Sequence, residues 1–185
     1  MRRLVLSLLC AVTVPAVHAT VLVPAEFREV VQGSSLIAYG RVIDVQPQWV
    51  DDRSRVETVV TLEVVTWLKG GPNPTLAFRV PGGELGRYRN VTIGAPVFTR
   101  GDEAVLFLKS DGSSLPIVVG LNQGVFRVRR EPGTGLRVVI PSALMASRAS
   151  PEVVRRGAAT RRPIPLESFG AQVRSVIAQS SGGRR

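Results

Sequence analysis

Residues 56–68 read Val-Glu-Thr-Val-Val-Thr-Leu-Glu-Val-Val-Thr-Trp-Leu, and this stretch decides the fold class. Apolar and polar side chains alternate along it with a period of two, which indicates a β-strand with one buried face. The buried face is predicted to hold Thr58, Val60, Leu62 and Val64, and the opposite face Glu57, Thr61 and Glu63. We therefore look for the other strands of the sheet on either side of this stretch.

On both sides of this strand, the chain alternates short apolar runs with turn residues. Residues 36–45 form a predicted strand with Gly40 in its middle, a position that suits a β-bulge in a strongly curved strand, and residues 47–55 form a predicted polar loop. Further strands are predicted at residues 76–80, 104–108, 117–121, 125–129 and 136–140, and the second of these is apolar on both faces. This spacing predicts an all-β fold, a small OB-like β-barrel.

Two helices are predicted to flank the barrel domain, which spans residues 20–141. Pro24 suits a first helical position, so the N-terminal helix is predicted at residues 24–32. A linker at residues 142–163 leads to a C-terminal helix at residues 164–179, and residues 180–185 are predicted to be a disordered tail. The apolar residues at helical spacing in this second helix are Leu166, Phe169, Val173, Val176 and Ile177. We expect that stripe to dock on the barrel, the alternative being a partner or a membrane surface.

The first 19 residues have the composition of a signal peptide. A Met-Arg-Arg start precedes an apolar run at residues 4–14, and cleavage is predicted between Ala19 and Thr20. The run is shorter than the roughly 20 residues that a helix needs to span a bilayer. Lipid attachment at Cys10 is a further alternative, but Leu9 stands where a small residue is required. We therefore expect a periplasmic or secreted protein that leaves the membrane after cleavage.

The formal net charge of the chain is +10, but little of it lies in the predicted barrel. Eight arginines against two glutamates follow residue 147, whereas residues 20–147 carry 14 basic and 12 acidic side chains. Nucleic-acid-binding OB-folds need a basic groove interleaved with aromatic rings, and only 5% of this chain is aromatic. We expect no nucleic-acid partner, and we expect Trp49 and Trp67 to be buried at the barrel rim rather than to serve as ligand platforms.

The single histidine, His18, and the single cysteine, Cys10, both lie in the predicted signal peptide. Their removal excludes histidine-based triads, thiol nucleophiles, the usual zinc sites and disulfides from the mature chain. We therefore expect no catalysis, no cofactor and no metal. The acidic residues that leave a carboxylate-dependent hydrolase as an alternative are the pairs Asp51-Asp52, Asp102-Glu103 and Glu57/Glu63, which are more simply solvated charges. Asp51-Asp52 also lacks the spaced oxygen ligands of a calcium loop.

A glycine-rich loop at residues 81–89 carries the candidate binding patch. Arg87, Tyr88 and Arg89 place two cations and an aromatic ring on a loop that we expect to be exposed. The glycines before them are similar to a phosphate cradle, but such cradles need a helix N-terminus after the loop. Here short apolar pieces follow, within residues 91–99, so a turn is the simpler interpretation.

Several of these segments, in this order, resemble a group of uncharacterised exported bacterial proteins. The segments are a short helix ending near Ser34-Ser35, Leu-Ile-Ala-Tyr-Gly-Arg-Val at 36–42, Val-Val-Thr-Trp-Leu-Lys-Gly at 64–70, Phe-Arg-Val-Pro-Gly-Gly at 78–83, Gly-Asp-Glu-Ala-Val-Leu-Phe-Leu at 101–108 and Val-Gly-Leu-Asn-Gln-Gly-Val-Phe-Arg-Val at 119–128. The resemblance covers most of residues 24–130 and implies a shared fold without a known activity. The layout is more distantly similar to the OB-fold of the tissue inhibitor of metalloproteinases and of netrin-like modules. Their inhibitory mechanism does not carry over, because it uses an N-terminal cysteine and disulfides.

Together these observations favour an exported, non-catalytic binding or protein-interaction module. Its partner is expected to be an envelope or secreted protein, and the oligomeric state stays open. Fold alone does not separate this function from its alternatives. The carboxylate-dependent hydrolase would require two acids facing each other in a cleft, at about 5 to 10 Å. The nucleic-acid-binding alternative would require Trp49, Tyr88 and several arginines along one groove.

Overall fold

The computed structural model describes residues 24–110, 112, 114–140 and 163–182. The predicted signal peptide with its Ala19–Thr20 cleavage site, nearly all of the predicted linker, and residues 183–185 lie outside the described residues. The elements in chain order are α1 (Phe27–Gly33), β1 (Leu36–Val50), β2 (Arg55–Lys69), β3 (Thr75–Pro81), β4 (Gly83–Leu85), β5 (Tyr88–Asn90), β6 (Glu103–Lys109), β7 (Ile117–Val118), a 3-10 turn (Leu121–Gly124), β8 (Val125–Arg130), β9 (Arg137–Ile140), β10 (Ile164–Pro165) and α2 (Leu166–Gly182).

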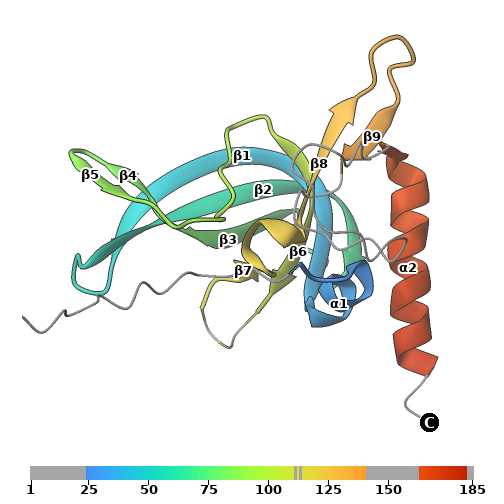
Figure 1. Cartoon of the computed structure of the whole chain (residues 1–185), viewed down its shortest axis with the longest axis horizontal. Coiled ribbons are helices and arrows are strands. Elements are labelled where there is room, and N and C mark those ends of the chain that lie inside the picture. The colour runs from blue at the N-terminus through green and yellow to red at the C-terminus, as the bar shows by residue number, and fades with distance from the viewer. Residues whose placement is uncertain (1–23, 111, 113, 141–162, 183–185) are drawn as a thin grey trace, which may run out of the picture.

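Five strands close into a barrel, which confirms the predicted all-β, OB-like class (Figure 1). Around the ring, β1 pairs with β2, β2 with β3, β3 with β7, β7 with β6, and β6 again with β1. Every pairing is antiparallel except the contact between β3 and β7, which is parallel and rests on the single pair Arg79↔Ile117. Beyond the ring, β8, β9 and β10 extend the sheet from the edge of β6.

Gly40 lets β1 bend enough to pair with both β2 and β6. The register between β1 and β2 shifts between Tyr39 and Gly40, as the predicted bulge requires. A Cβ atom at Gly40 would lie 2.2 Å from the Glu63 carbonyl oxygen and 2.8 Å from Leu62 Cγ. Only glycine fits this close approach of the two backbones, so Gly40 fixes the curvature that closes the barrel.

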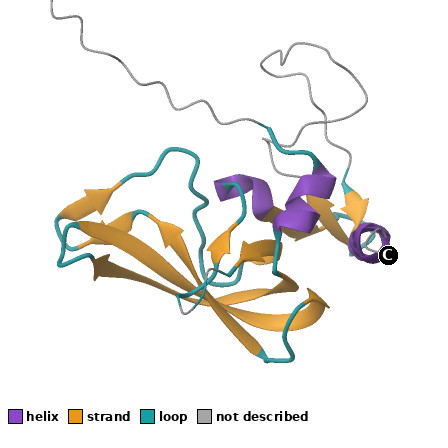
Figure 2. Cartoon of the chain, turned by 90° about the horizontal axis from the view of Figure 1, so that it is seen from below, coloured by secondary structure: helices purple, strands orange, loops and turns teal. Residues whose placement is uncertain are grey.

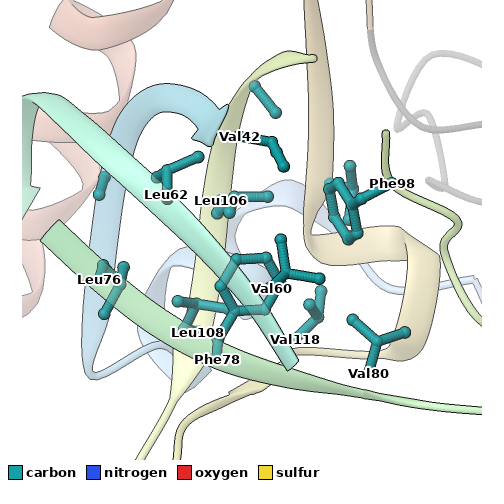
Figure 3. Packing of buried hydrophobic residues seen from close by; sticks show 13 residues of the cluster. Val42, Val60, Leu62, Leu76, Phe78, Val80, Phe98, Leu106, Leu108 and Val118 are labelled. Atoms are coloured by element: carbon teal, nitrogen blue, oxygen red, sulfur yellow. The ribbon is translucent and has the colours of Figure 1, made fainter. Parts of the chain in front are cut away.

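Residues 37–40 of β1 and residues 104–108 of β6 are buried on both faces, so the molecule has two apolar cores that share one sheet. The barrel core lies on one face, and Figure 3 shows Leu62, Phe78, Leu106 and Leu108 among the side chains that fill it. Neighbouring residues on the other face, such as Phe107, form a second core beneath the helices. The full burial predicted for residues 104–108 is therefore confirmed.

The two helices cover the second core side by side (Figure 2). Phe169 and Val173 of α2 are buried there, which confirms that the C-terminal helix docks on the barrel. Arg28 of α1 donates to Gln179 of α2 at 2.8 Å. The helix runs on to Gly182, where the sequence predicted a tail from residue 180. No helix among the described residues has the length and apolar character needed to cross a membrane.

The predicted start of the first helix was wrong by three residues. The helix begins at Phe27 instead of Pro24, and the backbone N–H of Glu26 donates to the Glu29 carboxylate at 2.9 Å. This capping contact fixes the first turn, because it satisfies one of the backbone donors that a helix start leaves free.

The loop predicted at residues 47–55 was also wrong, because both long strands continue through it. Strand β1 runs to Val50, and Trp49 pairs with Val56 of β2. The turn between them needs only residues 51–54, since Asp51, Asp52 and Arg53 all take left-handed φ values of 50° to 66°. Beyond Val42, the described residues of β1 pair with β2 alone, which leaves a free edge on which Pro47 is tolerated.

Two shorter predictions also change. The glycine-rich loop predicted at residues 81–89 is a hairpin of β4 and β5, joined by Gly86 and Arg87, where Gly86 has a φ of +62°. The strand predicted at residues 117–121 ends at Val118, and a 3-10 turn follows from Leu121. Figure 1 shows the β4–β5 hairpin and α2 at opposite ends of the long axis of the molecule.

Candidate functional site

The predicted patch of Arg87, Tyr88 and Arg89 lies at the tip of the β4–β5 hairpin. Tyr88 packs edge-on against Trp49 of β1, with the ring centroids 5.0 Å apart. The Arg87 guanidinium lies over the Tyr88 ring, 5.1 Å from its centroid, and donates to its hydroxyl at 3.1 Å. Arg89 forms an ion pair with Glu84 at 3.0 Å. The patch is exposed as predicted, but its two guanidinium groups and its aromatic ring already have partners within the molecule.

Trp67, the other tryptophan, lies far from this hairpin, on the half of β2 that pairs with the start of β1. Its indole N–H donates to the Asn73 carbonyl oxygen at 2.8 Å, and its ring packs against the barrel core. Both tryptophans are half-buried. The structure thus gathers Trp49, Tyr88 and Arg87 at one place, but edge-on packing and the overlying guanidinium occupy the aromatic faces that a nucleic-acid-binding platform would offer to bases.

A cleft of about 450 Å³ opens at the mouth of the barrel beside this hairpin. Its walls come from β1, β2 and β3, from the base of the β4–β5 hairpin, and from the loop of residues 91–99. The lining residues are Val45, Pro47, Thr58, Val60, Val80, Pro81, Gly82, Gly83, Glu84, Arg89, Asn90, Val91, Thr92, Ala95, Pro96, Val97 and Phe98. The walls are mainly apolar, and the volume falls in the range of roughly 300 to 1,000 Å³ that is typical of ligand sites.

The loop of residues 91–99 leaves large aliphatic side chains in solvent. The exposed fractions are 67% for Val91, 87% for Ile93 and 78% for Val97. Phe98 points inward instead, towards Phe78 (Figure 3), and the two ring centroids lie 5.4 Å apart. The Arg127 guanidinium lies over the Phe98 ring, 4.8 Å from its centroid. We call Val91, Ile93 and Val97 the apolar loop patch.

Hydrogen bonds hold this loop in place although it contains no regular secondary structure. The backbone N–H of Thr99 donates to the Asp102 carboxylate at 2.9 Å, and the Arg127 guanidinium donates to the Val97 carbonyl oxygen. The sequence indicates these short apolar pieces but not their exposure, because isolated valines and isoleucines also fit a buried position. The one sequence feature that could have indicated an exposed loop is that apolar and polar residues do not alternate in this segment.

The acidic residues considered for catalysis mostly form ion pairs with arginine. Among those residues the pairs are Asp51 with Arg55, Glu57 with Arg55 and Arg79, Asp102 with Arg127, and Glu103 with Arg41 and Arg137. Two further acidic residues are also paired, Asp44 with Arg100 and Glu84 with Arg89. Glu57 is only 8% exposed, so the prediction of a solvated charge was wrong for this residue. Its burial is tolerated because the two guanidinium groups compensate its charge.

These pairs set the ionisation of the carboxylates near the loop. Burial raises the pKa of Asp102, but hydrogen bonds from Thr99 and Arg127 outweigh burial and lower it. Burial likewise raises the pKa of Glu103, while hydrogen bonds from Tyr39 and Arg41 and the charge of Arg137 bring it below its usual range. A general acid needs a raised pKa, so neither carboxyl is suited to that role. Within the described part of the chain, no three or more residues are grouped so that they could hold a metal ion, and this holds also around Asp51 and Asp52.

Tyr39 is the buried partner of Glu103. Its hydroxyl donates to the Glu103 carboxylate at 2.6 Å. Burial, that hydrogen bond and the charge of Glu103 together raise the pKa of Tyr39 to about 12. The tyrosine therefore stays neutral at physiological pH and acts as a hydrogen-bond donor that fixes the carboxylate.

No family model, curated protein or solved structure matches this chain. The resemblance to exported bacterial proteins and to netrin-like modules therefore stays a prediction. The features that bear on function are the cleft, the apolar loop patch and the charges around them.

Proposed function

We propose that the chain is an exported, non-catalytic binding module that recognises a protein partner through the apolar loop patch and the adjoining cleft. The observation that carries this proposal is the exposure of Val91, Ile93 and Val97 on one loop beside an apolar cleft. Each square ångström of apolar surface left in water forgoes about 25 cal/mol of stabilisation, so grouped exposure of this kind marks interaction surfaces.

A protein partner fits this site better than a small molecule alone. Val91 and Val97 line the cleft, whereas the exposed Ile93 lies outside its lining, so the exposed aliphatic surface extends beyond the cleft. Protein interfaces combine an apolar centre with a polar rim, and arginine and tyrosine are enriched in them relative to the rest of the surface. Arg87, Tyr88 and Arg89 supply such a rim on the hairpin side of the cleft.

Pairing with arginine supports a binding role over the hydrolase alternative. Glu84 is an acidic residue in the wall of the cleft, and it is paired with Arg89. Glycoside hydrolysis needs two carboxyl groups that face each other across the substrate, one of them with a raised pKa. Among the described residues that line the cleft, Glu84 has no second carboxylate opposite it.

Capture from the envelope fraction of the source bacterium tests the proposal with the mature chain, residues 20–185. Three immobilised forms are compared: the natural sequence, Ile93→Asp, and the control Val65→Asp. Val65 is also an exposed aliphatic residue, at 62%, but it lies on β2 beyond the part paired with β3. A protein retained by the natural and control forms and lost with Ile93→Asp supports the proposal. Equal retention by all three, or retention by none, overturns it.

Export needs a separate test, because the capture experiment assumes it. Expression of the full chain with a C-terminal tag, followed by intact mass measurement of the exported product, is expected to give a chain that begins at Thr20. A product that keeps residue 1, or one that carries lipid, contradicts this part of the proposal.

A further inference from the structure

We infer that the partner presents acidic side chains to an arginine groove beside the apolar loop patch. This inference rests on the proposed function and specifies the chemistry of the partner. The groove, about 600 Å³ in volume, lies between the end of the loop and strand β8. Its lining includes Thr99, Arg127, Arg129 and Arg130.

The arginine groove and the apolar cleft form one continuous surface. Val97 lines both of them. Arg127 connects them as well, because its guanidinium donates to the Val97 carbonyl oxygen and lies over the ring of Phe98, a residue of the cleft wall. A partner seated on the apolar loop patch therefore has the arginine groove beside it.

The charges that meet in the groove are unbalanced. Two carboxylates, Asp102 and Glu103, line it together with three arginines. Asp102 is paired with Arg127 at 2.5 Å, and Glu103 is paired from outside the groove with Arg41 at 3.1 Å and Arg137 at 3.3 Å. The lining therefore holds three guanidinium groups against two carboxylates, an excess of one positive charge. Because Asp102 and Glu103 are already paired with Arg127, Arg41 and Arg137, neither carboxylate neutralises Arg129 or Arg130.

Arg129 and Arg130 carry the positive charge that is available to a partner. Both are exposed, and neither forms an ion pair or side-chain hydrogen bond with another residue of the described chain. The reason is topological: β6 pairs with β8 only as far as Val128, so the rest of β8 overhangs with β9 as a hairpin. Figure 1 shows the β8–β9 hairpin projecting from the barrel.

The charge excess is also independent of pH in the neutral range. Arginine stays protonated in proteins, and the pKa values of Asp102 and Glu103 are already lowered, so both remain ionised. Guanidinium groups match carboxylates with two parallel hydrogen bonds. Because exposed aliphatic side chains adjoin the arginines, an acidic protein segment with apolar residues fits this surface better than a polyanion without them.

A peptide probe tests the inference directly. The probe is a fluorescein-labelled nonapeptide in which glutamates flank a central Val-Leu-Val, and its reference has lysine in place of every glutamate. Binding to the mature chain is measured by fluorescence anisotropy at about 50 mM salt, where surface charges are weakly screened. We expect the glutamate peptide to bind and the lysine peptide to fail.

Charge reversal in the groove supplies the decisive comparison. Arg129→Glu/Arg130→Glu is expected to weaken binding of the glutamate peptide at least about tenfold. The control Arg53→Glu/Arg174→Glu makes the same change in net charge on exposed arginines outside the groove, and it is expected to stay within about twofold of the natural chain. Equal weakening by both double variants, or equal binding of the lysine peptide, overturns the inference.

Inorganic polyphosphate, used as a competitor, separates the two sources of negative charge. If polyphosphate binds more tightly than the glutamate peptide and depends on the same two arginines, the groove is a phosphate site and the inference is overturned. The outcome for the proposed function stays distinguishable. The capture experiment is therefore repeated with Arg129→Glu/Arg130→Glu. If capture is lost with Ile93→Asp but not with this double variant, the proposed function stands and the acidic partner is overturned. If the glutamate peptide binds but capture does not depend on Ile93, the arginine groove binds acidic segments and the proposed function is overturned.

Discussion

The two halves of strand β1 differ in nearly every respect, although they belong to one continuous strand. Residues 36–41 pair with β2 on one edge and β6 on the other, and helices cover their outer face. From Ile43 to Val50 the described residues pair with β2 alone, the side chains are half-buried or exposed, and the apolar cleft lies against them. We call these the covered half and the open half.

The difference separates a part of the strand that is committed to packing from a part that the proposed function assigns to binding. Apolar side chains on both faces of the covered half commit it to packing. The open half keeps one apolar wall, which the β4–β5 hairpin and the loop of residues 91–99 only partly cover. Mutations should therefore act mainly on stability in the covered half and mainly on binding in the open half.

The largest expected effect is on the covered half, at Phe107. This ring is fully buried and contacts Phe27, Phe126 and Phe169. Phe107→Ala should lower the free energy of unfolding by about 4 kcal/mol, measured by urea denaturation. Phe98→Ala should cost only about half as much, because that ring borders the open cleft and water fills the space it leaves. Equal losses would remove the energetic distinction between the halves.

The next effect in size is expected at Gly40, the bulge position of the covered half. A methyl group there would overlap the Glu63 carbonyl oxygen, so Gly40→Ala should lower the free energy of unfolding by about 3 kcal/mol. The matched control is Gly33→Ala, where a Cβ atom would meet nothing closer than Val119 Cγ1 at 3.9 Å. The control should leave stability unchanged or raise it, since alanine is the better helix former. A loss at Gly33 as large as that at Gly40 would contradict the bulge argument.

A pH-dependent effect of roughly 2 kcal/mol is expected from Tyr39, which lies in the covered half. Its pKa is raised from 10 to about 12 in the folded protein, so its contribution is complete below pH 10 and is lost as pH rises towards 12. Denaturation curves at several pH values should show the natural chain losing stability over this range relative to Tyr39→Phe. Parallel curves for the two proteins would show that Tyr39 does not titrate as described.

The smallest stability effect is expected in the open half. Ile93→Ser should change the free energy of unfolding by less than about 0.5 kcal/mol, because the side chain is 87% exposed. The same variant should lose the captured partner. A large loss of stability would place Ile93 in the packing of the barrel and would remove the basis of the apolar loop patch.

Sequence periodicity was sufficient to predict the strands that form the covered half of the barrel, but it was insufficient to predict the strand structure of the open half. The apolar faces of residues 56–68 and 104–108 predicted the barrel and its second buried face, because burial on a strand repeats every two residues. Pro47 and the polar residues after it indicated a loop, yet an edge strand accepts them. The burial of Glu57 depends on Arg79, which is distant in the sequence and near only across β2 and β3.

The candidate site was predictable in part. The exposed position of Arg87, Tyr88 and Arg89 followed from the glycines around them. Their contacts did not: the Tyr88 contact depends on where the hairpin lies relative to Trp49 of β1, and the ion pair of Arg89 with Glu84 depends on the register of a hairpin that was predicted as a loop. The arginine groove was hidden for a related reason: its charges come from the loop before β6 and from β8, and the domain they belong to is nearly neutral as a whole.

Pro47 has a consequence for solubility. A strand edge with unpaired backbone groups is a template on which another chain can polymerise, and the open half of β1 has such an edge. A proline within a sheet is tolerated where its nitrogen, which carries no hydrogen, faces the free edge. A chain added along β1 would therefore find no backbone donor at residue 47. The open half is thereby protected against aggregation through strand addition while its apolar cleft stays accessible.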